Sequence, residues 1–384
     1  MVSAVRRGVS LRKVAWKFRV HLRTVQRWVQ RAMGRRLDRV AWADRPDGCR
    51  RSAHRVATCL EDRILALRRE LKERSALGEY GAVAIHRTLI EEAYAEVPSV
   101  RTIGRVLDRR GALDGQRRVR RAPPPRGWYL PAVASGHAEL DSFDIVDGLV
   151  IRGGLDVQVL NGISLLGGLC VSWPEASITA KMAVKRLVQH WRQFGLPSYA
   201  QFDNDTVFQG AHQWADSFGR VTRLCLNLGI VPVFTPPRET GFQAMIENYN
   251  GRWQAKVWSR FEHASREALC QRSAAFVVAA RQRTAVRRDS APTRRPFPAH
   301  WSLNLRAALH GVVICLRRTD HAGAVELLGH RFQLSMQWLH RLVRAEVHLT
   351  DQCIRFYALR RRQPDDQPLL KEIPYAPPTK HFVD

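Results

Sequence analysis

The first 35 residues of the chain place apolar side chains at helical spacing. In the stretch GVSLRKVAWKFRVHLRTVQRWVQRAM, residues 8–33, two apolar stripes are separated by a short link near residues 19–22. The stripes consist of Leu11, Val14, Ala15 and Phe18, and then of Val25, Trp28 and Val29. This spacing predicts a helix-turn-helix over residues 1–40. A plain helical hairpin with a solvated basic face is the alternative, because Arg19 stands where a glycine often makes the turn.

A second helical unit is predicted over residues 55–115. The segment EDRILALRREL is amphipathic, and AIHRTLIEEAY follows it after a stretch rich in helix breakers. Ser99 behind Pro98 is in position to cap a further helix. That helix echoes the LRTVQRW stretch of the first unit, so we expect a second helix-turn-helix. Residues 116–136 then combine a basic run with a proline triplet, which predicts an exposed linker that could follow a phosphate backbone.

From residue 137 the pattern changes to strands that alternate with helices. Strands are predicted over 138–151, 155–164, 165–173, 198–203 and 230–237, and helices over 176–195, 211–229 and 242–261. This order predicts an α/β domain with a mixed sheet over residues 137–265. After a segment rich in Pro and Arg, alternating stretches over residues 300–375 predict a small β-barrel. The fold class is therefore multidomain α/β.

Charge adds the first functional indication. The chain has 62 Lys and Arg residues against 35 Asp and Glu, a formal net charge of +27, which favours a polyanionic partner. No apolar run is long enough to span a membrane, and the N-terminus lacks the apolar region of a secretory signal. We expect double-stranded DNA as the partner, no membrane and a cytoplasmic location. The residues expected to contact DNA are Arg23, Thr24 and Arg27 in the first helical unit and Arg101, Thr102 and Arg105 in the second.

Three carboxylates in the α/β domain are candidates for a metal site. Asp144 lies within the first predicted strand, Asp203 at the end of a later one, and Glu247 in a helix. A carboxylate inside an apolar sheet is costly unless something compensates its charge, and Mg²⁺ (or Mn²⁺) needs few carboxylates because it keeps several waters. Each acid has a simpler interpretation. Asp144 suits a solvated strand end, Asp203 a local turn with Asn204 and Asp205, and Glu247 the edge of an apolar helix stripe. Their occurrence together in so basic a chain favours the metal interpretation.

The same segments resemble a known family. FDNDTVFQG, LGIVPVFTPPRETGFQAMIENYNGRW and the hairpin IRGG…VLN are similar to the integrase catalytic core of bacterial insertion-sequence transposases, over about residues 137–265. The resemblance implies a ribonuclease H-like core and a catalytic triad at Asp144, Asp203 and Glu247. It also implies Mg²⁺ (or Mn²⁺), with two ions held by these acids, and the cutting and joining of transposon ends. Gln243-Ala244 and Asn248 depart from the family's pattern, but none of them is a metal ligand.

The segment ELDSFDIVDG offers two early aspartates, Asp141 and Asp144. Because their separation is odd, their side chains point to opposite faces of a strand, so only one can enter the site. Strand geometry alone does not choose between them, and the resemblance assigns Asp144.

The interpretation is therefore a DDE-type transposase (a polynucleotidyl transferase) that binds transposon ends, cleaves DNA and transfers the strand. A homo-oligomer is expected on DNA, because two ends must be brought together. Two alternatives stay open: a catalytically inactive helix-turn-helix regulator derived from a transposase, and another nuclease with the ribonuclease H fold. Metal-dependent nicking of the protein's own end sequence distinguishes the first alternative.

Overall fold

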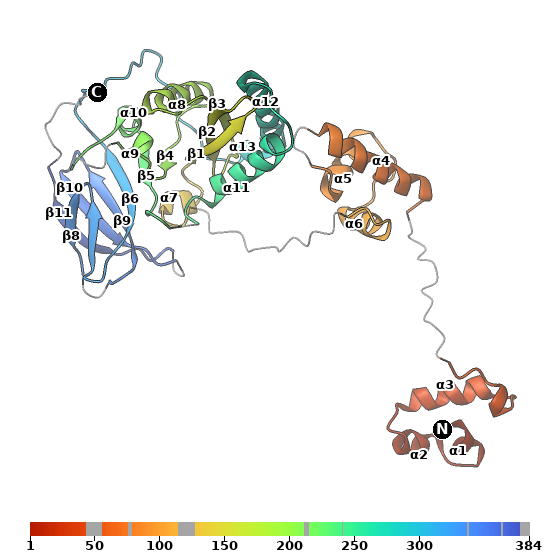
Figure 1. Cartoon of the computed structure of the whole chain (residues 1–384). Coiled ribbons are helices and arrows are strands. Elements are labelled where there is room, and N and C mark those ends of the chain that lie inside the picture. The colour runs from red at the N-terminus through yellow and green to blue at the C-terminus, as the bar shows by residue number, and fades with distance from the viewer. Residues whose placement is uncertain are drawn as a thin grey trace. The chain divides into compact units, whose positions relative to one another are not determined.

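The structure is a computed structural model of the chain (Figure 1). It describes residues 1–43, 56–75, 79–113, 127–210, 215–239, 241–335, 338–361 and 364–376. The chain divides into two compact units, Met1–Glu61 and Asp62–Asp384. None of the helices in the described residues is long and apolar enough to cross a membrane.

The N-terminal unit contains the two helices that its apolar stripes predict. Its elements are α1 (Val2–Arg6), α2 (Leu11–Lys17), α3 (Leu22–Ala32) and a short 3-10 turn (Leu37–Arg39). Ser10 caps α2 by accepting a hydrogen bond from the Lys13 backbone N–H at 3.5 Å. Between α2 and α3, Arg19 has φ of 50°, the left-handed conformation that a tight turn requires. Val14 and Val25 are buried where the two helices meet.

Three helices follow: α4 (Thr58–Arg74), α5 (Ala82–Glu91) and α6 (Val100–Arg109). The predicted cap of the last one is confirmed, since the Ser99 hydroxyl accepts from the Thr102 backbone N–H at 3.3 Å. On α6, Ile103, Val106 and Leu107 are buried, which leaves the opposite face of the helix at the surface.

The described end of the predicted linker is partly buried. Residues 114–126 lie outside the described residues. Within residues 127–136, which include α7 (Pro131–Ala134), residues 127–130 and Val133 are buried, whereas Pro131 and residues 134–136 are exposed. Trp128, Tyr129 and Leu130 are each less than 5% exposed and belong to a hydrophobic cluster of the larger unit. The expectation of exposure was wrong for this part, because its aromatic and aliphatic side chains gain more from burial than the backbone gains from solvation.

A mixed sheet organises the larger unit. Its first strands are β1 (Leu140–Ile151), β2 (Leu155–Ser164), β3 (Cys170–Glu175), β4 (Tyr199–Phe202) and β5 (Val231–Phe234). β1, β2 and β3 form an antiparallel meander, whereas β4 pairs parallel to both β1 and β5. The predicted mixed α/β arrangement is confirmed at this level.

Helices cover both faces of this sheet (Figure 1). On one face, side chains of α8 (Ala180–Phe194) and α10 (Arg220–Asn227) join a cluster with Phe143 of β1. On the other face, α11 (Ala244–Trp253) and α12 (Arg266–Arg283) join a cluster with Val146 of β1. Because α12 belongs to this helical layer, the α/β domain extends past residue 265, where the sequence predicted its end. α11 continues into a π-helical turn, Gln254–Trp258, and the short helices α9 (Thr206–Gln209) and α13 (Ala285–Asp289) complete the unit.

The C-terminal strands continue the same sheet. They are β6 (Val312–Arg318), β7 (Ala324–Leu327), β8 (His330–Gln333), β9 (Leu342–His348), β10 (Cys353–Ala358) and β11 (Leu369–Pro374). The order β11-β10-β9-β6-β5-β4-β1-β2-β3 makes nine strands, and β7 with β8 forms a separate two-stranded sheet. The predicted β-barrel over residues 300–375 is not confirmed: β6 pairs with β5, which would otherwise be an open edge.

Candidate active site

Asp144 and Asp203 lie on neighbouring strands. β1 and β4 run parallel with Ser142 opposite Gln201, and continuing this register by two residues brings Asp203 beside Asp144 on the same face of the sheet. Asp203 directly follows β4, and Glu247 lies in the first turn of α11, the helix that covers this face. Two strands and one helix therefore supply the three predicted acids.

The electrostatics of Asp144 indicate that the three acids act on one another. Burial raises the pKa of Asp144 to about 6, and the charges of Asp203 and Glu247 contribute to this rise. Burial also raises the pKa of Asp203, with a contribution from Asp205. Among the described residues, no Lys, Arg or His forms an ion pair with any of the three acids. Asp144 and Asp203 are thus partly buried and Glu247 is exposed, and no cation in the described part of the chain pairs with them.

A chain of two amides holds the Asp144 carboxylate in place. Asn250 Nδ2 donates to Asp144 Oδ2 at 2.7 Å, and Asn161 Nδ2 donates to Asn250 Oδ1 at 2.8 Å. Asn161 is fully buried on β2, directly opposite Asp144. Asn250 lies three residues after Glu247, on the same face of α11. Sequence reasoning missed both amides. The spacing of Glu247 and Asn250 was the one signal that could have indicated Asn250.

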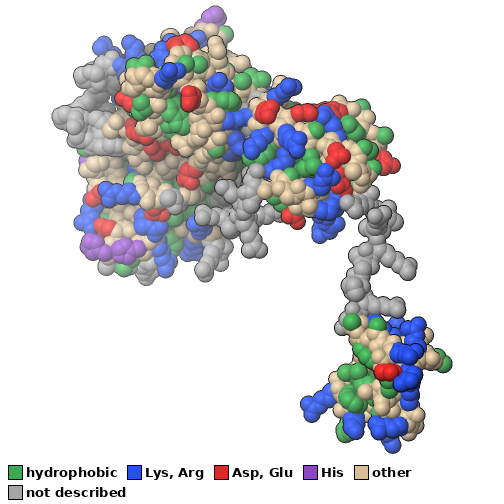
Figure 2. Space-filling model, turned by 45° about the vertical axis from the view of Figure 1, so that its right-hand side comes forward, with side chains coloured by type: hydrophobic (Ala, Val, Ile, Leu, Met, Phe, Trp, Pro, Cys, Tyr) green, Lys and Arg blue, Asp and Glu red, His purple; other side chains and the backbone are tan. Residues whose placement is uncertain are grey.

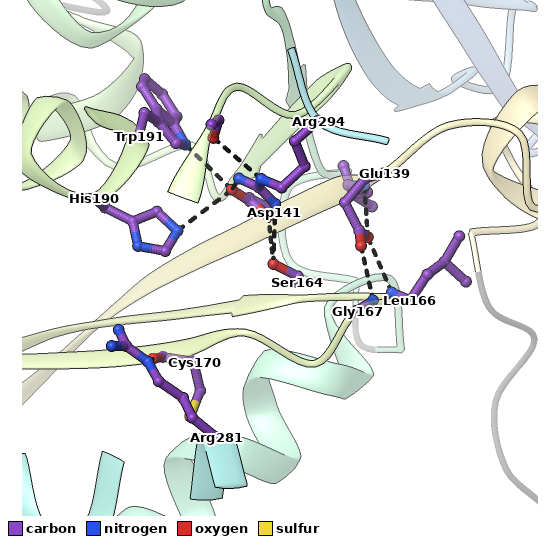
Figure 3. Close-up of polar contacts among 12 residues, drawn as sticks. Glu139, Asp141, Ser164, Leu166, Gly167, Cys170, His190, Trp191, Arg281 and Arg294 are labelled. Atoms are coloured by element: carbon purple, nitrogen blue, oxygen red, sulfur yellow. Dashed lines mark hydrogen bonds and ion pairs between the residues drawn. The ribbon is translucent and has the colours of Figure 1, made fainter. Parts of the chain in front are cut away.

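Asp141 belongs to a different network on the opposite face of the sheet (Figure 3). Arg294 donates to it from both terminal guanidinium nitrogens, with Nη1 at 2.9 Å from Oδ1 and Nη2 at 2.5 Å from Oδ2. Ser164 and Trp191 donate further hydrogen bonds, and His190 Nε2 lies 3.6 Å from Oδ2. Burial alone would raise the pKa of Asp141, but Arg294 and His190 hold it well below its usual range. A buried arginine compensates the charge of this aspartate, whereas no Lys, Arg or His in the described part of the chain pairs with Asp144.

The donor chemistry of the three acids fits a hard divalent cation. Their oxygen ligands are those that Mg²⁺ prefers, and their mutual repulsion is what such a cation would relieve. Even so, no group of three or more His, Cys, Asp or Glu side chains in the described part of the chain is arranged to hold a metal ion. The acids are close enough to interact electrostatically but do not form a closed cage. Mg²⁺ commonly binds through one or two carboxylates together with substrate phosphates.

The residues expected to contact DNA lie on two helices. Arg23 and Arg27 are exposed on α3, and Arg101 and Arg105 are exposed on α6. Lys and Arg side chains are spread over the face of the N-terminal unit that Figure 2 shows.

The two threonines expected to contact DNA are half-buried. Thr24 lies on α3 and Thr102 on α6. The Thr102 hydroxyl shares a 3.0 Å hydrogen bond with Ser99 at the start of α6.

The chain shows distant similarity to several solved structures. No family model and no curated protein matches the chain. The simian T-cell lymphotropic virus intasome in complex with PP2A regulatory subunit B56 gamma is 13% identical, with 79% of this chain and 95% of that chain covered and a TM-score of 0.33. The catalytic core domain of BIV integrase is 18% identical, with 38% and 81% covered and a TM-score of 0.27. The HTLV-2 integrase catalytic core domain in complex with magnesium is 11% identical, with 36% and 82% covered and a TM-score of 0.27. Scores of this size are too low to carry an argument, so the assignment rests on the site itself.

Proposed function

We propose that this chain is a DDE-type transposase that cleaves DNA at the ends of a mobile element and joins the new end to a target. The observation that supports the proposal most is the electrostatic coupling at Asp144: burial and the charges of Asp203 and Glu247 raise its pKa to about 6, and no Lys, Arg or His among the described residues pairs with it. Perturbed carboxylates that converge from separate elements are typical of functional sites.

Asp144 and Asp203 would hold one Mg²⁺ or Mn²⁺ ion, and Glu247 with Asp144 or Asp203 a second. When bound, these ions would supply the positive charge that stabilises a phosphodiester undergoing displacement. Asn250 keeps Asp144 Oδ2 in one orientation, since its amide nitrogen lies 2.7 Å away. The α11 helix supplies both Glu247 and Asn250, so that one rigid element orients two groups of the site.

Recognition of the DNA is assigned to the helices at the N-terminal side of the chain. We propose that α3 reads element ends through Arg23, Thr24 and Arg27, and that α6 adds contacts through Arg101, Thr102 and Arg105. The short turn at Arg19 and the exposed arginines of α3 suit a helix-turn-helix whose second helix enters the major groove. A homo-oligomer on DNA follows from the need to join two ends at once.

Cleavage of the element's own ends tests the proposal. The full chain should nick a DNA fragment carrying the inverted repeats that flank its coding sequence when Mg²⁺ is present, and should not do so in EDTA. Glu247→Gln should bind the same fragment and leave it intact. Binding of the ends without nicking by the wild type, in Mg²⁺ and in Mn²⁺, would instead identify an inactive regulator.

A further inference from the structure

A cavity of about 570 Å³ lies between the segment that follows β4 and the C-terminal strands. Asn204, the residue after Asp203, contributes to its wall together with Gln209 and Ser217. From the C-terminal side the wall includes Arg317 of β6, with His330 and Arg331 of β8. The part of the chain after residue 300 thus completes a space whose wall begins one residue after the candidate acid Asp203.

Arg317 brings a positive charge to this cavity, whose wall also includes the exposed Glu326 of β7. Arg317 is only 8% exposed. Its Nη1 donates to the backbone oxygens of Leu316 at 2.9 Å and Thr235 at 3.3 Å, and within the described residues it forms no ion pair with a carboxylate. Burying a cation without an acidic partner is costly, and an anion in the cavity would offset that cost.

Gln209 brings a buried acceptor that has no donor. Its Oε1 is enclosed and has no hydrogen-bond partner among the described residues, although the residue lines the cavity. A buried polar atom of this kind costs free energy unless a ligand satisfies it. Asn204 is held in the same wall by donating to the Thr235 backbone oxygen at 2.7 Å. The cavity is therefore suited to a ligand with an anionic group at Arg317 and a hydrogen-bond donor at Gln209.

The wall formed by β7 and β8 is fixed to the core by Asp216. The Asp216 backbone N–H donates to the Leu328 oxygen at 3.0 Å, and its carboxylate lies 2.9 Å from His330 Nε2. The Tyr375 hydroxyl donates to the same carboxylate at 2.8 Å. These contacts hold the cavity open in the absence of a ligand, and preorganisation of this kind favours binding.

We propose that this cavity binds one nucleotide of the DNA strand on which the acids act, with its phosphate at Arg317 and its base edge at Gln209. A nucleotide carries both required groups, because adenine, cytosine and guanine each have an exocyclic amino donor beside an anionic phosphate. The inference rests on the proposed function, since the nucleotide belongs to the DNA strand that would be cleaved at the acids and would extend from Asp203 into the cavity.

Binding of three fluorescent DNA duplexes to the full chain in EDTA tests this assignment. One duplex is blunt, one has a single-stranded extension of deoxycytidines, and one has an extension of abasic sugar-phosphates. Arg317→Gln should weaken binding of both extended duplexes about tenfold, the loss expected for a charge-assisted hydrogen bond, and leave the blunt duplex unchanged. Gln209→Leu should weaken only the deoxycytidine extension, by about fivefold, because the abasic extension offers no base to bind.

Arg318→Gln is the matched control. Arg318 neighbours Arg317 on β6 but is exposed and pairs with Glu239, so its loss removes one charge outside the cavity. It should affect the three duplexes equally.

Several outcomes would overturn the assignment. Equal losses on blunt and extended duplexes would make Arg317 a general electrostatic contact, and no loss would remove it from the site. If Arg317→Gln does not fold, the loss of discrimination between deoxycytidine and abasic extensions in Gln209→Leu decides alone. Displacement of the extension by an equal concentration of deoxycytidine monophosphate would assign the cavity to free nucleotides, because a tethered nucleotide should withstand about a hundredfold excess.

Because binding is measured without divalent metal, the result is independent of cleavage. Cleavage by a chain that does not discriminate among the three duplexes would contradict the cavity assignment alone. Discrimination by a chain that never cleaves would contradict the proposed activity alone.

Discussion

Asp141→Asn should destabilise the larger unit although Asp141 lies only three residues from Asp144. The substitution keeps the size of the side chain but removes the negative charge that Arg294 binds through two hydrogen bonds. Asp141 is 1% exposed and the Arg294 side chain 11%, so the remaining guanidinium is left as a buried, unpaired cation. Removing one partner of such a pair costs about 3–5 kcal/mol of unfolding free energy.

Asp144→Asn should have the opposite effect on stability. The pKa of Asp144 is raised from 3.8 to about 6, and each unit corresponds to about 1.4 kcal/mol, so its ionisation opposes folding by at most about 3 kcal/mol. Solvent screening at this half-buried site reduces the expected gain on removing the charge to about 1–2 kcal/mol. A group whose folded pKa is raised stabilises the protein below its unfolded pKa and loses that contribution as the pH rises. Wild-type stability should therefore fall between about pH 4 and pH 6, and the Asn variant should lack this fall.

Urea unfolding at pH 7, followed by tryptophan fluorescence, measures both variants against the wild type. With a slope of about 3 kcal/mol per molar urea for a unit of this size, Asp141→Asn should lower the midpoint by about 1 M or more, and Asp144→Asn should raise it slightly. Equal midpoints for Asp141→Asn and the wild type would refute the view that Arg294 depends on this carboxylate. A clear loss of stability in Asp144→Asn would refute the view that its charge is uncompensated.

Three further predictions concern the DNA reaction. Asp203→Asn should abolish cleavage and retain end binding, whereas Asp205→Asn should cleave near the wild-type rate, because asparagine also caps the helix that Asp205 begins; gel assays of both variants measure this, and inactivity of the Asp205 variant would contradict it. Deleting residues 1–35 should reduce end binding more than binding to random DNA, and Arg27→Ala should lower the slope of log affinity against log salt by about 1 if it touches phosphate; unchanged discrimination after the deletion would move recognition to α6. Asn250→Leu should slow cleavage without weakening end binding, and a wild-type rate would remove the amide from the site.

The sequence predicts those parts of the fold in which the pattern is local. The strand predicted over 155–164 has the same bounds in β2, because glycine-bearing turns delimit it on both sides. Helix α12 escaped prediction because its apolar residues are spread around the helix and do not form one stripe. The helix predicted over 211–229 is shorter, since α10 begins only at Arg220, and residues 211–214 lie outside the described residues.

The partners of the acids could not be predicted, because they come from distant segments. The hydrogen bond from Asn250 to Asp144 spans 106 residues, and that from Arg294 to Asp141 spans 153. The pairing of β6 with β5 is likewise determined by tertiary structure: β6 pairs with the edge of β5 that would otherwise be open, and no local sequence pattern indicates this. The candidate acids can be predicted from the residue types and their order in the sequence. The groups that compensate their charges can be identified only in the folded chain.

Single-turnover cleavage of element-end DNA by Asp144→Asn tests the central claim most directly. The variant should fold, bind the ends with wild-type affinity and cleave them in Mg²⁺ at a rate lower by about a thousandfold, because the group of acids loses the charge that supports the reacting phosphate. Cleavage at the wild-type rate by the folded variant would contradict the account and remove Asp144 from the active site.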